Sequence, residues 1–140
     1  MDKVLIDTDV LMDFFFERKP FAKYATELIN LCAEKKVEGF TTPVIIANVY
    51  YLLRKTANHS ITVEKLKQLL TIIEIVSIEK NAVLDALNSD FKDFEDALQN
   101  FSAVENGEIK IILTRNLKDF KKSELAILTP ETYLKGIAST

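Results

Sequence analysis

Two short apolar runs that end in acid or amide side chains constrain this chain more than any other feature. Residues 3–6 lead directly into Asp7 and Asp9, and residues 109–114 are followed by Asn116. Short apolar runs of this kind are typical of strands buried in a parallel sheet. Ligands of open α/β sheets bind beyond the carboxyl ends of the strands. The polar strand ends therefore predict one shared site, and their oxygen atoms favour a hard divalent cation, Mg²⁺ or Mn²⁺.

Length and charge limit the classes of protein that need to be considered. The 140 residues predict a single domain, residues 1–140, that is large enough to bury its own core. The net charge of −3 gives no overall basic field, so any contact with RNA must come from a local patch. The single Cys32 excludes an internal disulfide. A signal peptide and a long apolar stretch are both lacking, so we expect a cytoplasmic protein with no membrane contact.

The rest of the chain predicts strands that alternate with helices. Further strands are expected at residues 37–41, 73–78 and 126–128. Helices are expected at residues 10–16, 44–55, 81–87 and 93–105, and others are expected to begin at Phe21, Thr62 and Pro130, with a loop at 58–60. This alternation predicts an α/β fold with helices packed around a central, mainly parallel sheet.

Asp7 and Asp9 share the exit of the first predicted strand. Asp9 is explained equally well as the N-cap of the helix that follows. Asp7 is harder to explain by structure alone, because an acid that ends a buried strand needs a partner or a cation. A functional role is therefore favoured for Asp7.

The densest group of acids lies at residues 90–97. Asp93 can cap the next helix with Asp96 answering from the third helical position, an account that needs no catalysis. Asp96, however, adjoins the apolar stripe of that helix, so we expect it beside the core. Asp93 and Glu95 are expected to lie in solvent.

Asn48 lies within an otherwise apolar helical segment. A lone amide in such surroundings must be paired, and a backbone carbonyl is the commonest partner. No spacing indicates a serine or cysteine triad, and the three isolated glycines exclude a phosphate-binding loop.

Taken in order, residues 4–11, 94–98 and 112–120 resemble the PIN-domain family of metal-dependent ribonucleases, which includes the VapC-type toxins of toxin–antitoxin pairs. The resemblance implies a PIN-like three-layer sandwich with an acidic pocket at the carboxyl edge of its sheet. It also implies a pocket that holds Mg²⁺ or Mn²⁺ and hydrolyses RNA. The implied metal ligands are Asp7 and Asp96, and the implied catalytic residues are Asp7, Asp96, Asn116 and Asp119.

Two positions depart from the family pattern. Asp9 stands where the family commonly has Asn, which adds charge and should not harm cation binding. Asn48 stands where the family supplies a Glu, so a carboxylate is missing from the expected set. Asp9, Asp93 or Glu95 could compensate, and we expect Asp9, Asn48 and Glu95 to support the site.

The resemblance also bears on partners. Arg115 and Lys118 follow the last predicted site strand and could hold the RNA backbone, although a solvated rim explains them equally well. If the resemblance extends to toxin biology, a small antitoxin protein covers the pocket and the chain forms a homodimer.

Two other functions remain open from the sequence. Asp7 and Asp9 after an apolar strand also resemble the opening of haloacid dehalogenase-like phosphatases, but Leu11 stands where that motif needs Thr or Val. The other possibility is a PIN-like module that binds RNA or a protein without cutting, and Asn48 is the residue that favours it.

Overall fold

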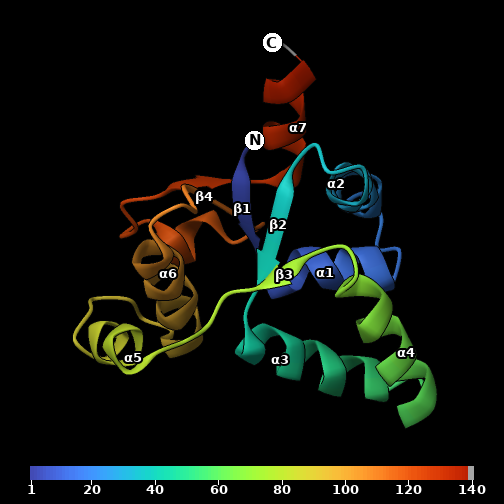
Figure 1. Ribbon diagram of the computed structural model, residues 1–140, viewed down its shortest axis with the longest axis horizontal. Helices are drawn as coiled ribbons and strands as arrows, with labels where there is room; N and C mark the ends of the chain where they lie inside the picture. The colour runs from blue at the N-terminus through green and yellow to red at the C-terminus, as the bar shows by residue number, and fades with distance from the viewer. Residues whose placement is uncertain (139–140) are drawn as a thin grey trace.

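The computed structural model describes residues 1–138 and is built on one five-stranded sheet (Figure 1). The strand order is β3-β2-β1-β4-β5, and all neighbouring strands pair in parallel. The strands are β1 (Lys3–Ile6), β2 (Glu38–Thr41), β3 (Glu74–Ile75), β4 (Ile111–Leu113) and β5 (Ala126–Leu128). The α/β fold with a parallel sheet, expected from the alternating pattern, is confirmed.

Helices cover both faces of the sheet. In Figure 1, α1 and α2 lie on one side of the strands, and α6 lies on the other with α5 packed against it. The helices are α1 (Thr8–Phe15), α2 (Ala22–Ala33), α3 (Pro43–Arg54), α4 (His59–Leu69), α5 (Lys80–Leu87), α6 (Phe94–Asn106) and α7 (Pro130–Ala138), with a 3₁₀ turn η1 (Leu117–Phe120). Within residues 1–138, none of these helices combines the length and apolarity that a membrane span requires.

Strand β1 explains why two of the apolar clusters of the core lie on opposite faces of the sheet. Side chains of a strand alternate between the faces of a sheet. Val4 and Ile6 join the apolar cluster that includes residues of α1, α2 and α3, whereas Leu5 joins the cluster that includes Ala103 of α6. Val4, Leu5 and Ile6 are all fully buried, whereas Lys3 at the start of the strand is partly exposed. Three consecutive apolar residues are therefore required in the central strand of this sheet.

Polar caps fix where the site helices begin. Asp7 caps α1 and Asp93 caps α6, where the Asp93 carboxylate accepts a hydrogen bond from the backbone N of Asp96 at 2.9 Å. The predicted cap at Asp93 is thus confirmed. Helix α3 begins with Thr42, whose Oγ1 accepts from the backbone N of Ile45 at 3.1 Å. These three helix starts all lie beyond the strand ends, so first-turn residues of α1 and α6 face the carboxyl edge of the sheet.

The strand predicted at 109–114 shortens to β4 and the helix predicted at 10–16 begins earlier, at Thr8, and two further predictions are also wrong. The predicted loop at 58–60 is the start of α4, because the Asn58 side chain caps the helix by accepting from the backbone N of Ile61 at 2.8 Å. The strand predicted at 73–78 shortens to β3, whose only ladder partner among residues 1–138 is the end of β2. Ile73 and Val76 are buried beside β3 but do not extend the ladder. The apolar run therefore predicts a longer strand than the structure contains.

Candidate active site

Asp7 lies between the end of β1 and the start of α1, and only 4% of it is exposed. Its Oδ1 accepts hydrogen bonds from the backbone N of Thr8 at 2.7 Å and from Nε2 of Gln99 at 2.9 Å. Its Oδ2 accepts from Oγ1 of Thr114 at 2.7 Å. Donors from α1, from α6 and from the end of β4 therefore hold this carboxylate in one orientation.

Asp9 lies in the first turn of α1, so its alternative role as the N-cap is wrong: Asp7 occupies the cap. Its Oδ2 accepts from the backbone N of Arg115 at 3.0 Å, and its Oδ1 is buried with no hydrogen-bond partner among the described residues. Burial, followed by the charge of Asp7, raises the pKa of Asp9 to about 6. A buried carboxylate oxygen with no donor is a position that a cation can satisfy.

Asp96 lies in the first turn of α6 and is half-buried, as its place beside the apolar stripe predicts. Burial is the first cause that raises its pKa, to about 7. The charges of other acids follow in the order Asp7, Asp93, Asp119 and Glu95. These acids come from the end of β1, the start of α6 and η1, so the fold concentrates negative charge around Asp96.

Asn116 and Asp119 follow β4. The backbone N of Asn116 donates to Oγ1 of Thr114 at 2.9 Å, and the backbone N of Asp119 donates to the carbonyl of Asn116 at 3.1 Å. These bonds turn the chain sharply after the strand and bring both side chains to the edge where Asp7 lies. Both residues therefore lie at the carboxyl end of β4, as the sequence predicts.

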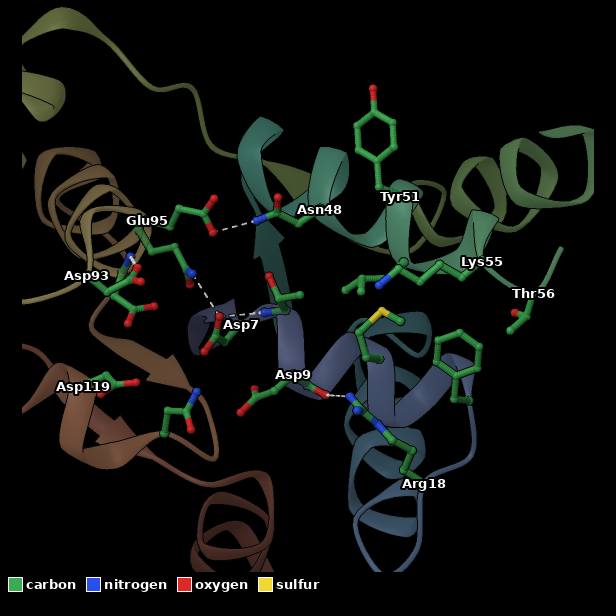
Figure 2. A pocket seen from close by; sticks show the side chains of 17 residues that line it. Asp7, Asp9, Arg18, Asn48, Tyr51, Lys55, Thr56, Asp93, Glu95 and Asp119 are labelled. Carbon is green, nitrogen blue, oxygen red and sulfur yellow. Dashed lines mark hydrogen bonds between the residues drawn. The ribbon is translucent and has the colours of Figure 1, made fainter. Parts of the chain in front are cut away.

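These residues line one cavity of about 780 Å³ at the carboxyl edge of the sheet (Figure 2). The cavity brings together all of the predicted catalytic, metal-binding and supporting residues. It also extends along α1 and α3 to residues that the sequence pattern does not indicate. The lining residues are Asp7, Thr8, Asp9, Met12, Phe16, Arg18, Asn48, Tyr51, Leu52, Lys55, Thr56, Asp93, Glu95, Asp96, Gln99, Asn116 and Asp119.

The donor set fits a divalent cation that keeps part of its water shell. Within residues 1–138, no three His, Cys, Asp or Glu side chains are grouped so that they could enclose a metal ion alone. Mg²⁺ does not need such an enclosure, since it usually binds through one or two carboxylates and retains several waters. The orphaned Oδ1 of Asp9 and Oε1 of Gln99 both belong to cavity residues. Both are acceptors, which a cation or its water molecules can satisfy.

Asn48 finds its partner across the cavity. Its Nδ2 donates to Oε2 of Glu95 at 2.9 Å, so the backbone carbonyl expected as its commonest partner is not the one it uses. Glu95 is exposed as predicted, yet its carboxylate is bound to another helix. The two supporting residues therefore form one contact between α3 and α6 (Figure 2).

The structure places the predicted RNA-binding residues outside the cavity lining. The guanidinium of Arg115 donates to both carboxylate oxygens of Asp13, from Nε at 2.7 Å and from Nη2 at 3.0 Å. It also lies over the ring of Phe21, with Cζ 3.9 Å from the ring centroid. Lys118 is exposed on η1. The cations that do line the cavity, among the described residues, are Arg18 and Lys55.

Three residues that hold charged side chains at or beside the site are not predicted from the sequence. Gln99 and Thr114 orient Asp7, and Asp13 binds Arg115 and Arg18. Gln99 does carry a usable indication, since it lies three residues after Asp96 on the same side of a helix. Asp13 stands in a similar relation to Asp9, four residues later in α1. Their partners come from distant segments, and no local pattern predicts those.

Comparisons with known proteins give a family match and a similar protein. The family model described as PIN domain matches residues 3–118. Ribonuclease VapC1 from Aquifex aeolicus (strain VF5) is 32% identical over 137 residues, which cover 94% of this chain and 93% of that protein.

Solved structures share the fold at lower sequence identity. VapBC2 from Rickettsia felis, bound to a DNA fragment from its promoter, superposes with a TM-score of 0.66 at 17% identity, covering 90% of this chain and 96% of the other. VapC20 from Mycobacterium tuberculosis, a toxin that cleaves the sarcin-ricin loop, gives a TM-score of 0.65 at 17% identity, covering 88% and 96%. The three-layer arrangement expected from the resemblance is therefore confirmed.

Proposed function

This chain belongs to the VapC-type PIN-domain family, and on that premise we propose that it is an endoribonuclease, the toxin of a toxin–antitoxin pair. The observation that carries the proposal is the convergence of Asp7, Asp9 and Asp96 on one cavity whose acids outnumber its cations. Such a cavity suits phosphodiester hydrolysis assisted by a metal ion. The phosphatase alternative is set aside because the family is a different one.

Asp7 and Asp96 would hold the Mg²⁺ or Mn²⁺. When bound, such a cation activates water and stabilises charge on the phosphoryl oxygens. The hydrogen bonds from Gln99 and Thr114 keep the Asp7 carboxylate in place for that task. From the β4 side, the Asn116 amide can donate to a phosphate oxygen, and the Asp119 carboxylate can accept a proton of the attacking water.

The RNA strand would leave the acidic end along α1 and α3. Arg18 and Lys55 line that part of the cavity, and two aromatic rings, Phe16 and Tyr51, line it with them. Tyr51 is 68% exposed, so its ring is accessible to a base. Cations that contact phosphates, combined with aromatic rings that stack on bases, are the usual means of binding single-stranded RNA.

The test is cleavage of RNA by purified variants in Mn²⁺. We expect Asp7→Asn and Asp96→Asn each to abolish cleavage and to remove Mn²⁺ binding in calorimetry. Glu105→Gln is the matched control, because Glu105 is an exposed acid of α6 outside this cavity. Cleavage by either Asn variant at the wild-type rate would overturn the assignment.

The proposed toxin role requires a partner that blocks the cavity. Solved relatives include VapBC2 and a toxin–antitoxin complex from Klebsiella pneumoniae. A small antitoxin encoded beside this chain should copurify with it and inhibit cleavage, and light scattering should show a homodimer. Failure of every neighbouring small gene product to inhibit would limit the proposal to the ribonuclease activity.

A second candidate function is an RNA- or protein-binding module that does not cut. Asn48 favours it, because an amide replaces a carboxylate on the cavity side of α3. Calorimetry separates the two functions, since a module that does not cut should bind RNA in the absence of Mn²⁺ and take up no Mn²⁺.

A further inference from the structure

Glu95 is an exposed acid whose carboxylate is nevertheless held in place. It lies in the first turn of α6, and its Oε2 accepts from Nδ2 of Asn48 on α3 at 2.9 Å. In Figure 2 the two side chains point toward each other across the cavity, on the side where Asp7 lies. Both residues line the same cavity as Asp7 and Asp96.

The contact is specific because neither side chain adopts the behaviour common for its type. An exposed glutamate normally samples several rotamers, and ordering such a side chain costs conformational entropy. A helical asparagine normally bonds a nearby backbone group. Asn48 instead donates to an acid 47 residues away, in a charge-assisted bond. Only Oε2 receives this donor, so Oε1 keeps its lone pairs for another partner.

A second, independent feature of the cavity points to a bound cation. Gln99 is 5% exposed, and its Nε2 donates to Asp7. Its Oε1 is buried with no donor among the described residues. An orphaned carbonyl oxygen inside a cavity lined by acids can accept a hydrogen bond from a water molecule, including one that a cation holds.

We propose that Glu95, positioned by Asn48, supplies the carboxylate that α3 lacks and acts, through the water shell, on the divalent cation that Asp7 and Asp96 hold. This inference rests on the proposed function. Asn48 is then a positioning residue that works through Glu95. The amide does not leave the site degenerate, since it directs an acid from the facing helix into the cavity.

The test measures Mn²⁺ affinity by calorimetry together with RNA cleavage. Glu95→Gln keeps an acceptor for the Asn48 amide and removes the charge, so the fold should be retained, with unchanged urea unfolding. We expect Mn²⁺ affinity to fall by at least about tenfold, the effect typical of lost groups around a metal. Glu105→Gln should change neither affinity nor cleavage. Wild-type Mn²⁺ affinity in Glu95→Gln would overturn the inference.

Two further variants test the positioning role. Asn48→Ala should weaken Mn²⁺ binding in the wild-type background and add nothing in the Glu95→Gln background, because coupled residues are not additive. The exchange Asn48→Glu with Glu95→Gln moves the acid to α3 and should recover most of the Mn²⁺ affinity. Additive losses and an exchange without recovery would both contradict the inference.

The two proposals fail in different ways. If Asp7→Asn keeps Mn²⁺ binding, the metal-dependent ribonuclease itself is wrong. If Asp7→Asn loses Mn²⁺ while Glu95→Gln retains it, the ribonuclease stands and only the role of Glu95 is wrong.

Discussion

Asp9 and Asp13 lie one turn apart on α1, but the electrostatic surroundings of their carboxylates differ. The side chain of Asp13 is 2% exposed and is neutralised by Arg115 and Arg18, whose Nε atoms lie 2.7 Å and 3.0 Å from its carboxylate oxygens. Asp9 has one backbone donor from Arg115, an orphaned oxygen and a pKa raised to about 6. The same arginine therefore contacts both acids, but its guanidinium pairs with only one.

The negative charge of the cavity therefore follows from how the fold directs its neighbouring cation, and composition alone does not explain it. Arg115 follows β4 beside Asp9, within reach of the acids, and its guanidinium is turned away to Asp13. The packing of that guanidinium over Phe21 keeps it there. The structure thus keeps one acid for stability and leaves its neighbours uncompensated. Uncompensated, partly buried acids in a cavity are the feature expected of a functional site.

The largest effect should follow from removing Asp13, the acid that pairs with two arginines. Asp13→Ala removes the buried acceptor of charged hydrogen bonds from two arginines, and such bonds typically contribute about 1.5 to 3 kcal/mol. We expect a loss of that size in the free energy of unfolding by urea. Asp85→Ala, at an exposed position of α5, is the control and should change little. Equal stability of the two variants would show that the Asp13 cluster is not structural.

The acids that lack a paired cation, Asp9 and Asp96, should make the stability of the protein depend on pH. The folded pKa values of Asp96 and Asp9 are about 7 and about 6, both raised from 3.8 by burial first. Between about pH 4 and pH 7 the folded protein therefore binds more protons than the unfolded chain. The unfolding free energy of the metal-free protein should fall as the pH rises through that window, by on the order of 2 kcal/mol after screening by solvent.

Urea unfolding at about pH 5 and about pH 8 in a chelator measures this fall. Saturating Mn²⁺ should reduce it, because the cation compensates the ionised acids. A metal-free protein that is equally stable at both pH values would remove the contrast between the two groups of acids.

A smaller effect of the same origin is expected from Asp96→Asn. The substitution removes one ionised acid from the cavity and should stabilise the metal-free protein at about pH 8 by about 1 kcal/mol. Stability and activity then change in opposite directions, as is common for residues of active sites. A loss of stability in Asp96→Asn would place Asp96 with Asp13 among the structural acids.

The sequence predicts the parts of the site that follow directly from strands and helix starts. Asp7 follows an apolar run, Asp96 follows a helix cap, and Asn116 follows the second site strand, so each is predictable from its own neighbours. The central sheet is equally predictable from the sequence, because buried parallel strands need continuous apolar runs.

The sequence does not predict which distant side chains meet. Gln99 reaches Asp7 from 92 residues away, and Arg115 reaches Asp13 from 102 residues away. The direction of a long side chain depends on the acid that the fold places beside it. For this reason the local pattern predicts a backbone partner for Asn48 and an RNA contact for Arg115, whereas the fold gives each of them an acid.

The smallest expected effect concerns Arg115 and separates its two possible roles. Arg115→Lys keeps the charge but loses the bidentate contact with Asp13 and the stacking on Phe21, which should cost about 0.5 to 1 kcal/mol of stability. If Arg115 is structural, cleavage by the folded variant should stay at the wild-type rate. Lys55→Ala, in the cavity, should instead weaken RNA binding and lower the slope of log affinity against log salt by about one. An Arg115→Lys variant that is as stable as wild type but binds RNA weakly would return Arg115 to the RNA-binding residues, because the guanidinium would then act on phosphate rather than on Asp13.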